Sequence, residues 1–361
     1  TLMRETARPY VHNRCPLLGP AHNAPEAALV PDATIIPVHS LAEAVDFLRG
    51  KYVIAPYRLA QDPQPPPDTM HGLDFADVKG QALAKRALEV AVAGGHHVLL
   101  IGPPGSGKTM LAQRLPSIQP ALTQEQVLEV TAVHSVCGLL NGTPLVRDRP
   151  FRSPHHTSST SALIGGGATP KPGEISLAHH GVLFLDELPE FHRDVLESLR
   201  QPLEDGVVHL ARARRSLSFP SQVTLVGTMN PCFCGRLMDS RGGCRCSSTQ
   251  VQRYLSKVSG PLLDRIDLHI EVPAQPFETL THGPSAESSS TIRGRVQRAI
   301  AWRQQRGQKL STARLGAKEL KLHCQLTADA TQLLRTAMQE LELSARSYTK
   351  ILKIARTIAD L

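Results

Sequence analysis

Residues 97–109 read His97-Val-Leu-Leu-Ile101 and then Gly102-Pro-Pro-Gly-Ser-Gly-Lys108-Thr109. The apolar run predicts a buried strand, and the second segment fits the pattern G-x-x-x-x-G-K-S/T, which leads into a helix. Glycines let the backbone turn its N–H groups toward a phosphate, and the following helix N-terminus adds positive potential. A chance glycine-rich turn is the alternative, but the strand before it and the helix after it favour a nucleotide-binding loop.

The residues of this loop have separate expected roles. Lys108 is expected to reach the β- and γ-phosphates of ATP, and Thr109 is expected to offer its hydroxyl to Mg²⁺. The backbone that would surround the phosphates belongs to Gly102, Pro103, Pro104, Gly105, Ser106 and Gly107. The sequence therefore predicts a site for ATP and Mg²⁺.

Two further apolar runs end in polar side chains. Asp186 and Glu187 follow Gly181-Val-Leu-Phe-Leu185, and Asn230 comes shortly after Gln222-Val-Thr-Leu-Val-Gly227. In open α/β folds, ligands collect at the carboxyl ends of the strands. There Asp186 would hold Mg²⁺ and Glu187 would act as the general base on the attacking water, unless the acidic pair only caps the next helix. Asn230 could orient that water or form a turn before the next proline.

Periodicity divides the chain into a core and flanking segments. Helices alternate with short strands over residues 74–278, which is typical of an α/β sheet, and one helix is predicted over 80–93 with Leu83, Ala87 and Val90 on one stripe. A linker at 279–290 leads to a small helical domain over 291–361. Its helices are predicted at 292–306, 328–342 and 344–360.

The N-terminal segment, residues 1–61, is joined to the core by a proline-rich linker at 62–73. It contains a strand-like run, Thr34-Ile-Ile-Pro-Val38. An amphipathic helix follows, with Ser40 as the N-cap, Leu41, Val45 and Leu48 along it, and Gly50 as its stop.

The composition is that of a soluble globular protein, with 41% hydrophobic and 20% charged residues and no apolar run near the ~20 residues of a membrane span. Because no signal-peptide pattern opens the chain, the cytoplasm is the expected compartment. The net charge of +8 favours polyanionic partners, although a basic chain is often only well solvated. With 4% aromatic residues, any contact to nucleic acid should be mostly to the backbone.

Four of the seven cysteines are close together in Cys232-Phe-Cys234 and Cys244-Arg-Cys246. Four thiolates hold Zn²⁺ tetrahedrally, so a structural zinc site is expected. A loop of reduced cysteines is the alternative, because C-x-C is tighter than the common spacing. His155-His156 and His179-His180 lack the helical spacing and the carboxylate of a metal motif.

The segment 207–219 reads Val207-Val-His-Leu-Ala-Arg212-Ala-Arg214-Arg215-Ser-Leu-Ser-Phe219. Its flanks are strand-like, and Arg212 and Arg214 are two apart, so they share one face while the chain stays extended. The sequence predicts a hairpin with a basic tip that could neutralise the phosphates of a nucleic-acid backbone; a solvated charged hairpin is the alternative. The next candidates for DNA contact are Arg152, His155 and Lys171.

The motifs taken together resemble the ComM/YifB family, the magnesium-chelatase-like branch of AAA+ ATPases. The resemblance runs from about Asn23 to Leu361. It is carried by Gly80-Gln81, the loop at 102–109, Phe151-Arg-Ser-Pro-His-His156, Gly165-Gly-Gly167, Pro172-Gly173-Glu174, Leu185-Asp-Glu-Leu188, Met229-Asn-Pro-Cys232 and Ser259-Gly-Pro-Leu-Leu-Asp-Arg-Ile-Asp-Leu268.

The resemblance implies an α/β AAA+ core with a C-terminal helical lid, preceded by the end of an α+β domain similar to ribosomal S5 domain 2 and the Lon protease domain. It implies a hexameric ring that moves DNA, a branch-migration helicase used in natural transformation. The 207–219 hairpin and an insertion at 151–167 would face the ring channel. A metal-chelatase motor subunit and a protein unfoldase are the rival readings.

Two arginine roles also come from the resemblance. It implies Arg265 as the finger that reaches a neighbour's nucleotide and Arg346 as the lid arginine. By chemistry alone, Arg265 could equally pair with Asp264 or Asp267, and Arg346 could be an ordinary surface residue.

Overall fold

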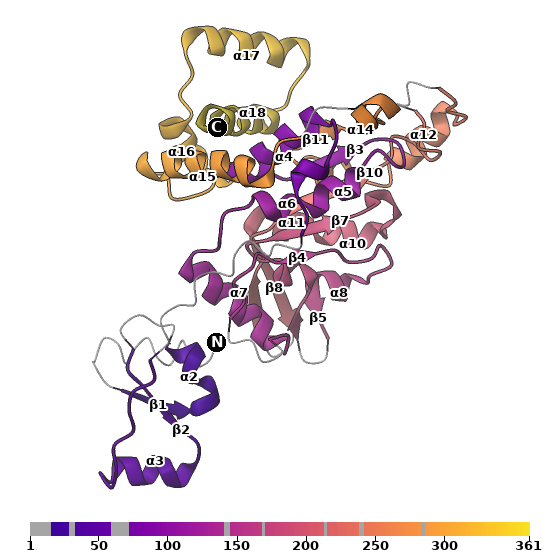
Figure 1. The fold of residues 1–361 in the computed structure, drawn as a ribbon. Helices are drawn as coiled ribbons and strands as arrows, with labels where there is room; N and C mark the ends of the chain where they lie inside the picture. Colours follow the sequence, from indigo (N-terminus) through magenta and orange to yellow (C-terminus); the bar gives the residue numbers. More distant parts are fainter. Residues whose placement is uncertain are drawn as a thin grey trace. The chain divides into compact units, whose positions relative to one another are not determined.

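The computed structural model describes residues 16–28, 33–58, 72–140, 145–167, 170–212, 215–237, 242–282 and 286–361 (Figure 1). The chain separates into two compact units, Thr1–Thr69 with Leu122–Asp148 and Met70–Ala121 with Arg149–Leu361. Most of the predicted linker at 62–73 lies outside the described residues. Among those residues, no helix has the length and apolar character needed to cross a bilayer.

The first unit contains two short parallel strands, β1 and β2, whose register places Leu17 opposite Ile35. Ser40 caps helix α3, because its hydroxyl accepts a hydrogen bond from the Glu43 amide at 3.2 Å. The apolar stripe of α3 is solvent-exposed, with Leu41 81% and Leu48 73% exposed. The elements of this unit are β1 Leu17–Pro20, η1 Ala21–Asn23, α2 Ala24–Ala27, β2 Ile35–Val38, α3 Leu41–Leu48 and α7 Gln124–Val136.

A five-stranded parallel sheet forms the centre of the second unit and confirms the predicted α/β class. Its spatial order is β11-β3-β10-β7-β4, so the strand before the glycine-rich loop lies between the last two strands of the sheet in the sequence. The carboxyl ends of all five strands therefore share one edge. The strands are β3 Val98–Ile101, β4 Phe151–Arg152, β7 Val182–Leu185, β10 Thr224–Met229 and β11 Leu268–Glu271.

Side chains alternate between the two faces of this sheet. Val98 and Leu100 of β3 belong to the core on one face, whereas Leu99 belongs to the core on the other. Every residue of β7 and β10 is buried, as expected for parallel strands covered on both sides. One face is covered by α4 Ala82–Gly94, α5 Lys108–Gln113 and α6 Leu115–Ile118; the other by α8 Thr160–Ile164, α9 Glu174–Leu177, α10 Arg193–Ser198, α11 Arg200–Asp205, α12 Ser248–Leu255 and α13 Gly260–Leu263.

The buried stripe of α4 differs from the predicted one at Leu83, which is 65% exposed. Ala84 and Leu88 are buried instead, together with Ala87. Helix α4 begins at Ala82 rather than at residue 80, because Gln81 is left-handed at φ 55°. The predicted positions Ala87 and Val90 are buried, so the stripe is confirmed there and fails only at Leu83, in the first turn of the helix.

Two antiparallel hairpins leave the core. β8 Val207–Arg212 pairs with β9 Arg215–Pro220, with Arg212 opposite Arg215, which confirms the predicted hairpin. β5 Gly165–Gly166 pairs with β6 Lys171–Pro172.

The C-terminal lid is all-helical, as predicted, and packs on the core. Helices α15 and α18 contact α4, and α15 also contacts α6. The buried His96 joins lid to sheet: one ring nitrogen lies 2.9 Å from the Thr357 hydroxyl in α18 and the other 3.3 Å from Asp267, just before β11. The C-terminal helices are α14 Phe277–His282, α15 Ser289–Gln305, α16 Ala317–His323, α17 Ala328–Glu340 and α18 Ala345–Asp360.

Candidate nucleotide site

The glycine-rich loop joins the carboxyl end of β3 to α5. Gly105 and Gly107 have φ values of 75° and 93°, which other residues rarely adopt. Gln81 holds the loop from outside, because its side-chain amide donates to the carbonyls of Ser106 (2.9 Å) and Pro273 (2.8 Å). The Ser106 hydroxyl is buried and has no hydrogen-bond partner within the described part of the chain, so the loop keeps a free polar group for a ligand.

Lys108 is buried inside the curve of this loop. Its ammonium group donates to the carbonyls of Gly102 (2.8 Å) and Pro103 (2.9 Å) and to the Asn230 side-chain oxygen (3.2 Å). Burial lowers the pKa of Lys108, and the carboxylates of Asp186 and Glu187 act in the opposite direction. The structure thus brings together four residues predicted from separate sequence motifs.

The two carboxylates meet the loop at the end of β7. The Thr109 hydroxyl donates to Asp186 at 3.1 Å, which joins the two side chains predicted to bind Mg²⁺. Glu187 has a left-handed backbone at φ 53° and ψ 53°, an uncommon conformation for a residue with a side chain. Such conformations persist where the surroundings hold them and are frequent at active sites.

Thr228 of β10 is a site residue that sequence reasoning missed. Its hydroxyl donates to the other Asp186 oxygen at 2.5 Å and accepts from the Glu187 amide at 3.0 Å. Thr228 is fully buried. A polar residue inside an otherwise apolar strand, two positions before Asn230, was the available signal.

The residues present fit a nucleotide and its metal. The loop amides, the free Ser106 hydroxyl and Lys108 suit phosphate oxygens, whereas Thr109 and Asp186 offer the oxygen donors that Mg²⁺ prefers. Asn230 and Glu187 lie at the same edge of the sheet. This arrangement can bind a nucleoside triphosphate and activate a water molecule beside it.

Arg265 and Arg346 lie at the opposite edge of the sheet. They line a cavity of about 440 Å³ together with Gly95 and His97, which precede β3, and Val223, which precedes β10. These residues mark the amino ends of the strands, whereas Lys108 follows a carboxyl end. The structure therefore does not bring the two arginines to the loop of their own chain.

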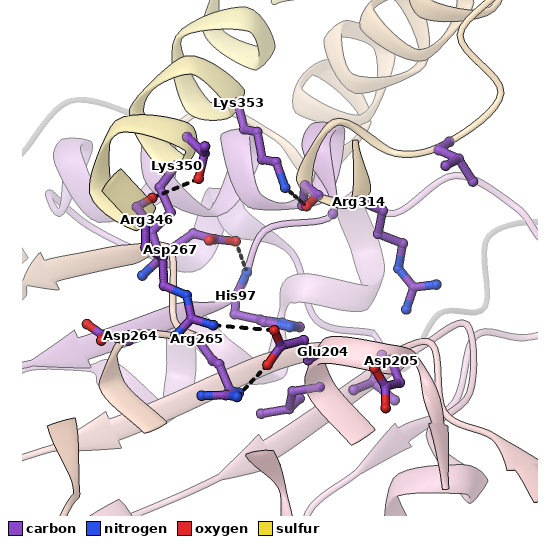
Figure 2. A pocket seen from close by; sticks show the side chains of 16 residues that line it. His97, Glu204, Asp205, Asp264, Arg265, Asp267, Arg314, Arg346, Lys350 and Lys353 are labelled. Carbon is purple, nitrogen blue, oxygen red and sulfur yellow. Dashed lines mark hydrogen bonds and ion pairs between the residues drawn. The ribbon is translucent and has the colours of Figure 1, made fainter. Parts of the chain in front are cut away.

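Both arginines converge on one carboxylate, Glu204 of α11 (Figure 2). Arg346 donates to one oxygen at 3.3 Å and Arg265 is paired with the other. Arg265 also donates to the carbonyls of Arg200 (2.8 Å) and Pro261 (2.7 Å). The ion-pair partner of Arg265 is thus neither of the aspartates adjacent to it in sequence.

Residues 74–280 match the family described as magnesium chelatase, subunit ChlI, and residues 286–361 match the ChlI C-terminal family. The chain is 45% identical to the protein YifB of Salmonella typhimurium and 43% identical to competence protein ComM of Haemophilus influenzae, each over 94% of this chain. The chain belongs to the YifB/ComM family of magnesium-chelatase-like AAA+ ATPases. It spans 66% of the length of these two relatives. A more distant relative is DNA helicase MCM8 of Bos taurus, 26% identical over 59% of this chain and 22% of that protein.

In this YifB/ComM-family chain, the four clustered cysteines come together in space. Their sulfur atoms all lie within 4.8 Å of one another, and Cys232 is 3.4 Å from Cys234 and 3.8 Å from Cys244. Zn–S bonds of about 2.3 Å in a tetrahedron put sulfurs about 3.8 Å apart, so the donor set fits Zn²⁺. Backbone N–H groups of Arg236 and Arg245 lower the pKa of Cys234 to about 6, whereas the neighbouring sulfurs of Cys234 and Cys232 raise the pKa of Cys244 and Cys246.

The predicted DNA contacts lie in several parts of the second unit: Arg212 and Arg215 on the β8–β9 hairpin, Lys171 on β6, Arg152 at the end of β4 and His155 in the loop after it. Arg212 is the last residue of β8 and Arg215 the first residue of β9, and Arg214 lies outside the described residues. Arg152 donates to both Glu174 oxygens, at 2.6 and 2.8 Å, so its charge is already paired.

The remaining two predicted DNA contacts are placed differently. His155 lies 2.9 Å from the Thr157 hydroxyl, whereas Lys171 is exposed on β6. His155 is exposed as well, whereas Arg152 is partly buried.

Proposed function

We propose that the chain hydrolyses ATP with Mg²⁺ and uses the reaction to move along DNA as a subunit of a hexameric ring. Lys108 and the loop amides hold the phosphates, while Thr109 and Asp186 hold Mg²⁺, which stabilises the developing negative charge. Glu187 takes a proton from water as the water oxygen bonds to the γ-phosphorus and the bond to ADP breaks. Asn230 orients that water.

One observation supports action between subunits: the arginine pair and the phosphate loop lie at opposite edges of one sheet. A strand of four residues such as β3 spans about 13 Å. Arg265 and Arg346 are therefore too far away to reach a γ-phosphate held by Lys108 of the same chain. We infer that both arginines leave Glu204 for the nucleotide of a neighbouring subunit.

We propose DNA as the polymer along which the chain moves, because the positive net charge and the named relatives both favour DNA. The hairpin formed by β8 and β9 ends in Arg212 and Arg215, and the chain carries a net charge of +8. A competence protein and a DNA helicase are among its relatives. Phosphate contacts of this kind give affinity without sequence preference. On this basis we propose branch migration of incoming DNA in natural transformation.

A second candidate is a motor subunit of a metal chelatase, because the matching family is described by that activity. The same nucleotide site would then remodel a protein partner rather than move along DNA. A protein unfoldase would likewise act on a polypeptide.

The four cysteines form part of the proposal as a structural Zn²⁺ site. Cys232, Cys234, Cys244 and Cys246 supply four thiolates and leave no open position for chemistry. Metal analysis of purified protein is expected to give about one Zn²⁺ per chain.

The functional proposal is tested by ATP turnover with no DNA, single-stranded DNA or forked DNA. Both DNAs are expected to raise turnover, with forked DNA also being unwound or migrated. Lys108→Ala serves as the control for contaminating ATPase. Normal turnover with no DNA binding and no stimulation even at low salt would contradict the DNA proposal and favour a protein substrate.

A further inference from the structure

The cysteine loop lies directly against the phosphate-binding loop. Gly235, one residue after Cys234, has φ 76° and approaches Pro104 so closely that a Cβ atom there would be 2.5 Å from the proline Cδ. The Gly235 amide also donates to the Cys232 carbonyl at 3.0 Å, which closes a tight turn between the two cysteines. This turn is therefore in direct packing contact with Pro104 of the phosphate-binding loop.

The second half of the cluster leads to the same site by another route. Cys246 is followed by Ser247, whose hydroxyl caps α12 by accepting from the Gln250 amide at 3.3 Å. Tyr254 of this helix is buried in the same apolar core as Met229, which directly precedes Asn230. Asn230 in turn accepts from Lys108.

We propose that Zn²⁺ in the four-cysteine cluster controls nucleotide affinity, because the metal fixes the turn that packs on Pro104. The inference rests on the proposed nucleotide and zinc sites. A bound ion would join Cys232 and Cys234 to Cys244 and Cys246. The turn that contains Cys232 and Cys234 and the start of α12 would then be held together. Without the ion, the described contacts that hold the turn are the Gly235–Cys232 hydrogen bond, the backbone N–H groups around the Cys234 sulfur and the burial of Cys232.

Coupling of this kind is reciprocal by thermodynamic necessity. If Zn²⁺ tightens nucleotide binding by some factor, nucleotide tightens Zn²⁺ binding by the same factor, typically about 5–150-fold. The wild-type chain is therefore expected to hold Zn²⁺ at least about fivefold more tightly against a competing chelator when a non-hydrolysable ATP analogue is present. A merely structural zinc site would show no such dependence.

Two glycines of the cysteine loop provide a matched pair of variants. Gly235 and Gly242 have φ values of 76° and 75°, so alanine carries the same backbone strain at both. A Cβ at Gly235 meets Pro104, whereas one at Gly242 meets no described atom within 4 Å. Gly235→Ala should keep its Zn²⁺ but weaken binding of the ATP analogue about tenfold and abolish the nucleotide effect on zinc retention. Gly242→Ala should behave as wild type.

The outcomes separate the proposals. Zinc retention that is unchanged by nucleotide in a protein binding both ligands would overturn the coupling and leave both sites standing. Absence of bound Zn²⁺ from folded, active protein would overturn the cluster and the coupling together. Failure of the zinc-loaded wild type to bind the analogue would overturn the nucleotide site, and the coupling with it. Wild-type reciprocity is measured first, so a poorly folding Gly235→Ala cannot decide the matter.

Discussion

At the residue scale, Thr228 is the side chain on which both carboxylates depend, because its hydroxyl bonds to Asp186 and to the Glu187 amide. Thr228→Val keeps the shape and removes both bonds. Outer-shell partners of this kind are worth about 10–100-fold in metal affinity or activity. ATP turnover should fall by that factor and recover at higher Mg²⁺ concentration if the metal is the part lost. Thr228→Ser, which retains the hydroxyl, should keep turnover; full activity of the valine variant would contradict the role.

Lys108 and Glu187 should fail at different steps. Lys108→Ala removes the buried cation expected to hold phosphate, so binding of a fluorescent ATP analogue should be lost. Glu187→Gln keeps the shape but not the base, and general bases contribute about 10²–10⁴-fold. That variant should bind ATP normally while phosphate release nearly stops. Wild-type turnover by the glutamine variant would remove Glu187 as the base.

At the element scale, the end of α18 is clamped to α15 by Asp360. Arg306 donates to both Asp360 oxygens at 2.8 Å, and Arg356 pairs with the same carboxylate. Burial alone would raise the pKa of Asp360, but these hydrogen bonds outweigh it and the net pKa is lowered. The clamp should therefore contribute stability above about pH 4, the ordinary pKa of aspartate, and lose it as pH falls through the lower folded pKa.

Asp360→Asn should lower the free energy of unfolding at pH 7 by about 1.5–3 kcal/mol, the range for hydrogen bonds to charged groups. It should also weaken the pH dependence below pH 4. Urea unfolding followed by fluorescence measures both, since Trp302 of α15 is the single tryptophan. Glu340→Gln at an exposed position of α17 should stay within about 0.5 kcal/mol. If the free energy of unfolding of the Asp360→Asn variant depends on pH below 4 as strongly as that of the wild type, the clamp is ruled out.

The β8–β9 hairpin carries the prediction on DNA. Replacing Arg212, Arg214 and Arg215 by Ala should weaken DNA binding regardless of sequence. The salt dependence should flatten by about one unit of slope for each phosphate that the hairpin no longer neutralises. Basal ATP hydrolysis should survive, while its stimulation by DNA falls.

A control with the same change in net charge tests whether position matters. Replacing Lys309, Lys318 and Lys321, which are exposed on the lid, by Ala removes three positive charges elsewhere. This variant should keep a near-normal salt slope. Equal slopes for the two triple variants would show that overall charge, not the hairpin, governs binding.

The secondary-structure elements show which features of the fold could be predicted from the sequence. β3, β7 and β10 are short apolar runs with sharp ends, so their polar followers Asp186, Glu187 and Asn230 could be placed at one edge from sequence. Leu83 was misplaced because it lies in the first turn of α4, where it is exposed, although Ala87 and Val90 of the same stripe are buried. Thr228 was missed because the two bonds that define its role come from other strands and turns. The meeting of Arg265 and Arg346 at Glu204 depends on how the lid docks, which no local pattern encodes.

At the scale of the whole molecule, turnover should require contact between chains. It should rise steeply with protein concentration, because each nucleotide lacks Arg265 until a neighbour supplies it. Arginine fingers contribute about 10³–10⁵-fold in GTPases. Arg265→Ala and Lys108→Ala chains are each expected to be inactive alone. Mixing them should restore part of the activity at interfaces that combine an intact loop with an intact arginine.

As a control, a chain carrying both substitutions replaces the Lys108→Ala chain in the mixture. This mixture should stay inactive, because none of its chains has an intact Arg265. No recovery at any ratio, with mixed assemblies demonstrated by mass, would count against action between chains. Arg346→Ala in place of Arg265→Ala should give the same complementation, because both side chains sit on Glu204.

The separation of the phosphate loop from the arginine pair also bears on how the subunits of an assembly contact one another. In the proposed function, each subunit carries the phosphate loop at one edge of its sheet and the arginine pair at the opposite edge. The proposed ring uses head-to-tail contacts, in which the loop edge of one subunit meets the arginine edge of the next and each contact completes one site. Head-to-tail contacts close into rings when the rotation fits and otherwise grow into open helical filaments. Variants that alter how the lid meets the core, such as at His96 or Thr357, should therefore be examined for polymers as well as for reduced activity.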